Sequence, residues 1–234
     1  MTEFSDKIVL VTGGAGTLGS TVAREFTAKG AKTIILDIRE DMVEKTKTDI
    51  GCDGLVCDLT DEVAVQQTVR EIVDQYGRID ILANIAGGFT MGGRTHETDL
   101  TTVVKMLDFN FRTMYTLSKH VLAQMITQDS GKIVSIGARA GLQGSPQMGP
   151  YVGSKAMVIR ATETMAREYK DDNININCVL PGTIDTPQNR SDMPDADVST
   201  WVPPIQLANV ILFLSSEQAV AINGAAIPVY GKGL

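Results

Sequence analysis

Thr12-Gly-Gly-Ala-Gly-Thr-Leu-Gly19 lies between the apolar run Lys7–Val11 and an amphipathic stretch that ends at Gly30. A glycine loop in this position lets the chain turn tightly and approach a pyrophosphate, which the amino terminus of the following helix then binds. Outside a strand-loop-helix context the same pattern is an ordinary turn, but here it predicts a dinucleotide site. The first candidate cofactor-binding residues are therefore Gly13, Gly16, Thr17, Leu18 and Gly19.

Apolar β-branched runs alternate with helical patterns along the rest of the chain. Seven strands are predicted, at 7–11, 33–37, 55–57, 79–83, 132–136, 174–180 and 225–230. Helices are predicted between them, at 18–29, 61–76, 100–126, 151–169 and 204–214. Most strand cores are apolar on both faces, which is typical of a parallel sheet covered on both sides. We expect an α/β fold, a Rossmann-type doubly wound parallel sheet of about seven strands that forms one catalytic domain over residues 1–234.

Polar residues follow the second, third and fourth predicted strands. Asp37 closes the second strand, eighteen residues after Gly19. A carboxylate there accepts hydrogen bonds from the adenosine ribose and repels a 2′-phosphate, so it favours NAD(H) over NADP(H). Arg39 opposes this preference, because a guanidinium binds phosphate. The next two strands end at the carboxyl edge, where ligands bind in this topology, and they contribute Asp58, Leu59, Asn84, Ala86 and Gly87.

Tyr151 and Lys155 lie one turn apart on a predicted helix. An ammonium on the same helix face favours the phenolate, so it lowers the tyrosine pKa from about 10 toward the range of a proton donor. Two residues four apart on a helix are more often a surface pair, so the spacing alone is weak evidence.

Composition excludes several classes of function. A formal charge of -7 and the lack of a basic run disfavour a nucleic-acid or anionic-membrane surface. The amino terminus resembles neither a signal nor a transit peptide, and the apolar stretches are too short to span a bilayer. Disulfide and metal sites are not expected from the cysteines and histidines, which are Cys52, Cys57, Cys178, His96 and His120. We expect a cytoplasmic protein that binds a small-molecule substrate.

The irregular segment 182–203 is long enough to serve as a substrate loop. Its Met193 and Trp201 either cover an apolar or planar ligand or pack on the domain, and both alternatives stay open. The candidate substrate-binding residues are Ala138, Met148, Met193 and Trp201.

Taken together, these motifs resemble the short-chain dehydrogenase/reductase family over essentially the whole chain. The matching residues are the loop 12–19, Asp37, Asp58, Asn84-Ile-Ala-Gly87, Asn110, Tyr151 with Lys155, and Pro181-Gly-Thr183. The resemblance implies that Tyr151 is the acid/base, that Lys155 lowers its pKa and binds the nicotinamide ribose, and that Asn110 holds a water in a proton relay. It also implies that Pro181, Gly182 and Thr183 border the nicotinamide. The implied reaction is hydride transfer between nicotinamide and a substrate carbon, in a homodimer or homotetramer.

Two positions depart from the family pattern. Thr17 stands where the family loop commonly has glycine, and Ala138 stands where it usually has a serine that donates to the substrate oxygen. Loss of one such donor costs about 3 kcal/mol of transition-state stabilisation. Ser135 does not replace it, because three residues along a strand place it on the opposite face, ~10 Å away. Arg139 also turns away unless the chain bends after Gly137.

Segments 137–148 and 180–201 resemble dihydropteridine reductases, a branch of the family that also lacks the serine and reduces a quinonoid pterin with NADH. Asn84, Asn110 and the loop at Thr12 instead resemble 3-oxoacyl and carbonyl reductases. Three functions stay open: an NAD(P)(H)-dependent oxidoreductase of small carbonyls or alcohols, including 3-oxoacyl compounds; a quinonoid-pterin reductase; and a non-catalytic dinucleotide sensor.

Overall fold

The apolar runs form one seven-stranded parallel sheet in the order β3-β2-β1-β4-β5-β6-β7. The computed structural model describes residues 3–233. The strands are β1 (Ile8–Thr12), β2 (Lys32–Asp37), β3 (Asp53–Val56), β4 (Ile81–Asn84), β5 (Gly131–Ile136), β6 (Ile174–Pro181) and β7 (Ala226–Val229). Strand order reverses between β1 and β4, and a doubly wound sheet binds its ligand at the carboxyl edge beside such a reversal. The predicted fold class is confirmed.

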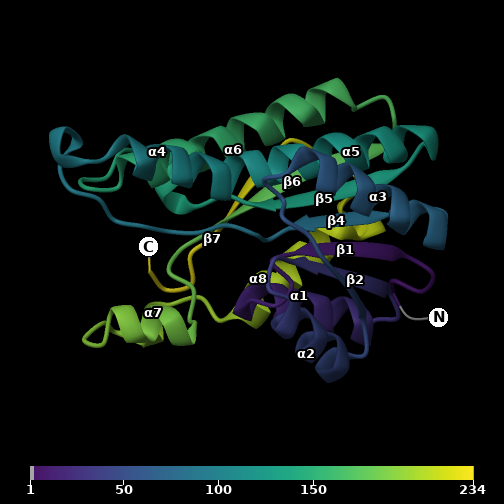
Figure 1. The fold of residues 1–234 in the computed structure, drawn as a ribbon, viewed down its shortest axis with the longest axis horizontal. Coiled ribbons are helices and arrows are strands. Elements are labelled where there is room, and N and C mark those ends of the chain that lie inside the picture. The colour runs from purple at the N-terminus through teal and green to yellow at the C-terminus, as the bar shows by residue number, and fades with distance from the viewer. Residues whose placement is uncertain (1–2, 234) are drawn as a thin grey trace.

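Helices cover both faces of the sheet (Figure 1). One hydrophobic cluster packs the sheet against α3 (Glu62–Tyr76), α5 (Thr113–Thr127) and α6 (Gly149–Glu168). A second cluster packs the other face against α1 (Thr17–Ala28), α2 (Glu40–Ile50) and α8 (Pro204–Ser215). Side chains of successive strand residues enter opposite clusters, as Leu10 and Val11 do, which explains why the strands are apolar throughout.

Three helical features differ from the prediction. Helix α2 was not predicted, because Val43 is its one fully buried apolar residue and most of its other residues are polar. The predicted helix 100–126 consists of α4 (Leu100–Leu107), a π-helical segment (Asp108–Arg112) and α5. A short helix, α7 (Pro187–Asp192), lies within the predicted loop. Short 3₁₀ turns occupy Thr95–Glu97, Arg139–Leu142, Val198–Thr200 and Glu217–Ala219.

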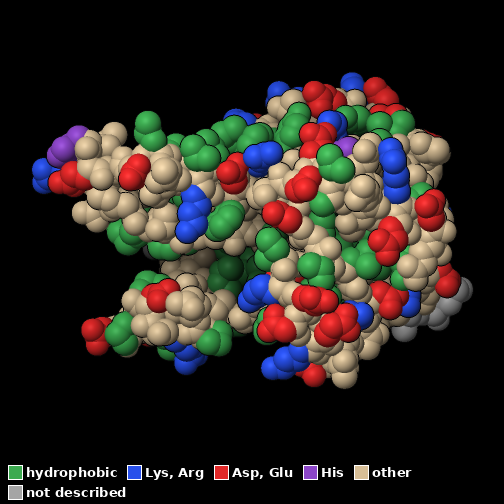
Figure 2. All heavy atoms as spheres, viewed as in Figure 1, with side chains coloured by type: hydrophobic (Ala, Val, Ile, Leu, Met, Phe, Trp, Pro, Cys, Tyr) green, Lys and Arg blue, Asp and Glu red, His purple; other side chains and the backbone are tan. Residues whose placement is uncertain are grey.

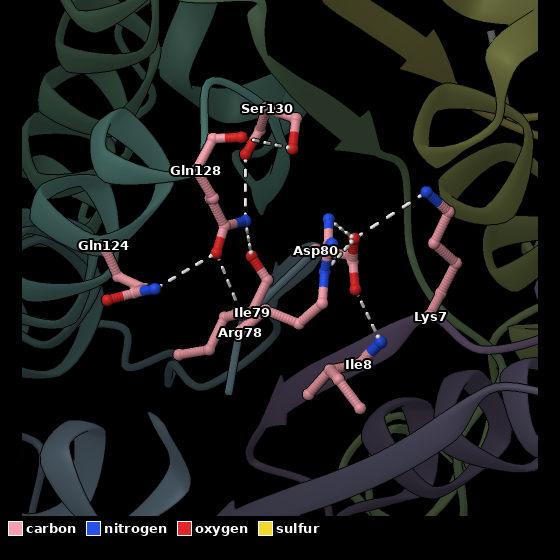
Figure 3. Close-up of polar contacts among 8 residues, drawn as sticks. All are labelled: Lys7, Ile8, Arg78, Ile79, Asp80, Gln124, Gln128 and Ser130. Carbon is pink, nitrogen blue, oxygen red and sulfur yellow. Dashed lines mark hydrogen bonds and ion pairs between the residues drawn. The ribbon is translucent and has the colours of Figure 1, made fainter. Parts of the chain in front are cut away.

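A polar network fixes the amino edge of the sheet (Figure 3). The buried carboxylate of Asp80 accepts the backbone N–H of Ile8 at 2.9 Å and pairs with Arg78 at 2.6 Å. The side chain of Gln128 donates to the carbonyl of Ile79 at 2.6 Å and accepts its N–H at 3.3 Å. These bonds join β1, the start of β4 and the end of α5 at the amino edge of the sheet. This edge lies opposite the carboxyl edge, whose loops form the predicted site.

A cleft separates α7 from the loop that leads into α4, and hydrophobic side chains are visible along it (Figure 2). The α4 loop follows β4 and α7 follows β6, so both walls arise from carboxyl ends of strands. Within residues 3–233, no helix has the length and apolar character of a membrane span.

Candidate active site

A cavity of about 360 Å³ lies at the carboxyl ends of β1, β2, β3 and β4. It brings together most of the predicted cofactor residues, namely Gly13, Gly16, Leu18, Gly19, Asp37, Asp58, Leu59, Ala86 and Gly87. Arg39 also lines it, as do residues with no role expected from the sequence, among them Ile38, Thr60, Ile85, Phe109 and Thr113. Phe109 and Thr113 belong to the π-helical segment and the start of α5, whose approach to the pocket depends on tertiary packing.

The glycine loop packs too closely for side chains. Gly13 has φ +59, and a Cβ there would lie 3.0 Å from the Cα of Ala86. A Cβ on Gly19 would lie 2.1 Å from the carbonyl oxygen of Gly13. Gly16 is the N-cap of α1 and provides no side-chain hydrogen bond, so the first-turn N–H groups stay free for an anion. Thr17 is exposed in that first turn. The loop therefore fits the pyrophosphate of a dinucleotide.

Asp37 and Arg39 form a paired acidic and basic site at the end of β2. The carboxylate of Asp37 is buried, and it accepts the backbone N–H of Ala15 at 3.2 Å. The guanidinium of Arg39 donates to both carboxylate oxygens, at 3.0 and 3.2 Å. The Asp37 interaction raises the pKa of Arg39. Asp37 is thus held by the loop, while the paired side chain of Arg39 is half-exposed.

Asn84 is placed differently from the other predicted cofactor residues. Its side-chain amide donates to Ser118 at 3.0 Å and to Ser135 at 3.3 Å, inside the layer between the sheet and α5. Asn84 is 3% exposed and does not line the cavity. The hydroxyl of Thr12 instead fixes the backbone at this strand end, because it accepts the N–H groups of Ile85 at 2.8 Å and Ala86 at 2.9 Å.

Tyr151 and Lys155 lie in the first turns of α6, which starts at Gly149. Burial raises the pKa of Tyr151 to about 12 and lowers the pKa of Lys155 to about 8, with Cys178 partly opposing the latter shift. The predicted lowering of the tyrosine pKa is therefore wrong. Both groups are desolvated, and the ammonium of Lys155 donates to the carbonyl of Ile136 at 2.8 Å.

Asn110 lies in the π-helical segment and connects the β4–α4 loop to α6. Its side chain exchanges two hydrogen bonds with the backbone of Gly88, both at 3.0 Å, and donates to Ser154 at 3.1 Å. Ser154 in turn donates to the carbonyl of Tyr151 at 2.8 Å. A Cβ on Gly87 would lie 2.7 Å from Asn110 Oδ1. Wide helical turns of this kind are common at functional sites, and this one places Asn110 between the two elements.

Ala138 is buried at the end of β5, and neither neighbour replaces the missing hydroxyl. Ser135 instead accepts a hydrogen bond from Asn84 in the core. Arg139 turns toward the end of the chain, where it lies 5.1 Å from the ring centroid of Tyr230 and donates to the carbonyl of Gly233.

The segment predicted as a substrate loop starts where β6 ends. The N–H of Gly182, which follows Pro181, donates to Val229 at 3.0 Å. The carbonyl of Thr183 accepts the N–H of Val202 at 2.8 Å, which closes the base of the loop. Met193 is 39% exposed, whereas Trp201 is 8% exposed. Of the two alternatives for Trp201, this burial favours packing on the domain.

Met148 immediately precedes α6 and is partly buried. The N–H of Gly92 donates to the carbonyl of the adjacent Gln147 at 2.8 Å, so the β4–α4 loop and the β5–α6 loop are joined beside Tyr151. No group of three or more His, Cys, Asp or Glu residues able to hold a metal ion occurs in residues 3–233.

Comparisons with known proteins show the family of this chain. A family model described as short chain dehydrogenase matches residues 7–197. The chain is 32% identical to the 3-oxoacyl-[acyl-carrier-protein] reductase of Thermotoga maritima, and 96% of each chain is covered. It is 31% identical to the 2-(R)-hydroxypropyl-CoM dehydrogenase of Xanthobacter autotrophicus, over 96% of this chain and 97% of that one.

Among solved structures, NAD+-bound xylitol dehydrogenase superposes with a TM-score of 0.90 at 26% identity, over 98% of this chain and 99% of that one. The family match covers the glycine loop, the π-helical segment and the Tyr151–Lys155 pair. The chain therefore belongs to the short-chain dehydrogenase/reductase family of NAD(P)-dependent oxidoreductases, which act on carbonyl and alcohol substrates.

Proposed function

We propose that this protein uses NAD(H) to interconvert a small carbonyl compound and its alcohol, with Tyr151 as the proton donor and acceptor. The proposal rests on the position of the nucleotide cavity beside the Tyr151–Lys155 pair. Gly87 lines the nucleotide cavity, and a Cβ on it would lie 3.4 Å from the Nζ of Lys155. The cavity and the catalytic pair are thus contiguous, as hydride and proton transfer to one substrate require.

The cofactor and the side chains have separate roles in the proposed reaction. A bound nicotinamide supplies or accepts the hydride. With a pKa raised to about 12, Tyr151 keeps its proton at neutral pH and gives it to the carbonyl oxygen during reduction. Lys155, when protonated, stabilises the negative charge that this transfer leaves on the phenol. Asn110 holds Gly88 and Ser154 and so fixes the positions of the β4–α4 loop and α6.

The substrate proposed first is a small ketone or a 3-oxoacyl thioester, since a 3-oxoacyl reductase and a dehydrogenase of a CoM conjugate are among the relatives. Ala138 favours a second candidate, a quinonoid dihydropterin, whose reduction places less charge on a carbonyl oxygen. The intact arrangement of Tyr151, Lys155 and Asn110 argues against a non-catalytic sensor. Steady-state NADH oxidation with ketones, 3-oxoacyl thioesters and a quinonoid dihydropterin separates these functions.

Ala138→Ser tests which of the first two candidates is right. A hydroxyl at this strand end would add a hydrogen bond to a developing oxyanion, so we expect kcat/KM for simple ketones to rise about tenfold. Because Ala138 is buried, thermal unfolding of the variant serves as the control for packing. An unchanged or lower rate with ketones, beside fast reduction of the quinonoid dihydropterin by the unaltered protein, would reject the carbonyl function in favour of the pterin.

The reduction rate is expected to decline as the pH rises through about 8. Burial lowers the pKa of Lys155 to about 8, so above that pH the side chain is neutral and no longer stabilises the phenolate. Tyr151 does not titrate in this range, since its pKa is raised to about 12. The measurement is kcat/KM for the carbonyl substrate at saturating NADH, between about pH 6 and about pH 10. A profile that stays flat or rises across this range would contradict the role of Lys155.

We also propose that segment 182–203 covers the substrate and that the protein forms a homodimer or homotetramer through α4 and α5. Exposed apolar side chains along these helices support the assembly, including Leu100, Val104 and Tyr115. Val121, in contrast, is fully buried against its own sheet.

A further inference from the structure

Phe89 touches the catalytic tyrosine. The ring centroids of Phe89 and Tyr151 lie 4.9 Å apart, and the ring planes meet at 86°. This edge-to-face geometry is a favourable arrangement for two aromatic rings. Phe89 follows Gly88 in the β4–α4 loop, so the loop brings a second aromatic ring to the residue that handles the proton.

The position of Phe89 is fixed on both sides. Asn110 holds the backbone N–H and carbonyl of Gly88. Three residues after Phe89, the N–H of Gly92 donates to Gln147. Phe109 packs behind Gly88, where a Cβ would lie 3.3 Å from its ring, and itself lines the nucleotide cavity. Two aromatic residues therefore lie on either side of Gly88 with different surroundings, Phe109 of the π-helical segment at the nucleotide cavity and Phe89 of the loop at Tyr151.

Phe89 is nevertheless 56% exposed. A phenyl ring that is held in place and left open to solvent beside a catalytic group offers a surface on which an apolar ligand can bury area. Ala138 provides no hydrogen bond to the substrate, so more of the substrate orientation must come from contacts with such a surface.

We propose that Phe89 is a specificity-determining residue that selects substrates with a flat, conjugated ring next to the reacting carbon. The ring of the substrate packs on Phe89, and its oxygen then meets the hydroxyl of Tyr151. This inference rests on the proposed function and adds the class of substrate to it: aryl or otherwise conjugated carbonyl compounds are preferred over saturated ones of the same shape.

The test compares acetophenone with cyclohexyl methyl ketone, which share a carbon skeleton but differ in planarity and π electrons. The variant is Phe89→Leu, which keeps an apolar side chain and removes the aromatic ring. We expect kcat/KM for acetophenone to fall about fivefold and that for the saturated ketone to change less than about twofold. Calorimetric Kd values for both ketones, measured with the NAD+-saturated protein, should show the same difference without turnover.

Met91→Leu is the matched control, since Met91 is equally exposed in the same loop at 56%. It should leave the preference between the two ketones unchanged, and Phe89→Tyr should keep the preference of the unaltered protein. Equal losses for both ketones in Phe89→Leu, or no preference in the unaltered protein by either measurement, would overturn the inference. Failure of the proposed function would give another result than failure of this inference, because the unaltered protein would then reduce no carbonyl substrate.

Discussion

Tyr151→Phe is expected to lower kcat for carbonyl reduction by about a thousandfold. The substitution removes one oxygen atom and keeps the ring, so the edge-to-face contact with Phe89 and the packing of α6 are preserved. Ala138 makes the loss more severe, since no serine hydroxyl at that position remains to assist the substrate oxygen. Single-turnover rates of NADH oxidation with the best substrate provide the measurement.

The same substitution at Tyr169, at the far end of α6, is the control and should leave kcat within about twofold. NADH affinity should be retained in both variants, because the nucleotide cavity is lined by other residues. A Tyr151→Phe variant that keeps more than about a tenth of the activity would show that another group transfers the proton.

Asp37→Ser is expected to weaken NADH binding between about tenfold and about a hundredfold, and to strengthen NADPH binding. Asp37 is buried and held by the N–H of Ala15, so it is unable to move away from a 2′-phosphate. Its removal frees the guanidinium of Arg39, which lines the same cavity, to bind that phosphate. Equilibrium Kd values for the two reduced cofactors, from fluorescence titration, report both changes.

Arg39→Ala separates the two members of this pair. It should leave NADH affinity nearly unchanged and weaken NADPH binding relative to the unaltered protein. The carboxylate of Asp37 would then repel the 2′-phosphate, with no guanidinium to offset the repulsion. If the unaltered protein binds NADH and NADPH equally well, the proposed preference for NAD(H) is wrong and Arg39 dominates the site.

Much of the fold was predictable because its signals are local. Strand cores that are apolar on both faces predicted a covered parallel sheet, and the loop at Gly13 to Gly19 predicted a phosphate cradle. The close approach to Ala86, where a Cβ on Gly13 would lie 3.0 Å from the Cα, explains why that loop requires glycine. The order of residues along the chain was sufficient here, because strand, loop and helix are consecutive.

What the sequence did not show depends on contacts between distant segments. The π-helical turn at Asp108–Arg112 has no evident sequence pattern and forms where Asn110 bonds to Gly88 and Ser154. The direction in which the pKa of Tyr151 shifts also depends on tertiary packing. Spacing alone indicated a stabilising cation, whereas burial of Tyr151 raises its pKa and Lys155 donates to Ile136.

Transfer of deuterium from labelled NADH to substrate tests the central claim most directly. The protein is incubated with NADH that carries deuterium at the transferring position of the nicotinamide, together with a ketone, a 3-oxoacyl thioester and a quinonoid dihydropterin in separate reactions. The predicted result is label on the carbonyl carbon of the reduced ketone or thioester, and none with Tyr151→Phe. Unlabelled product, or label only in the pterin reaction, would contradict the assignment of this chain as a Tyr151-dependent carbonyl reductase.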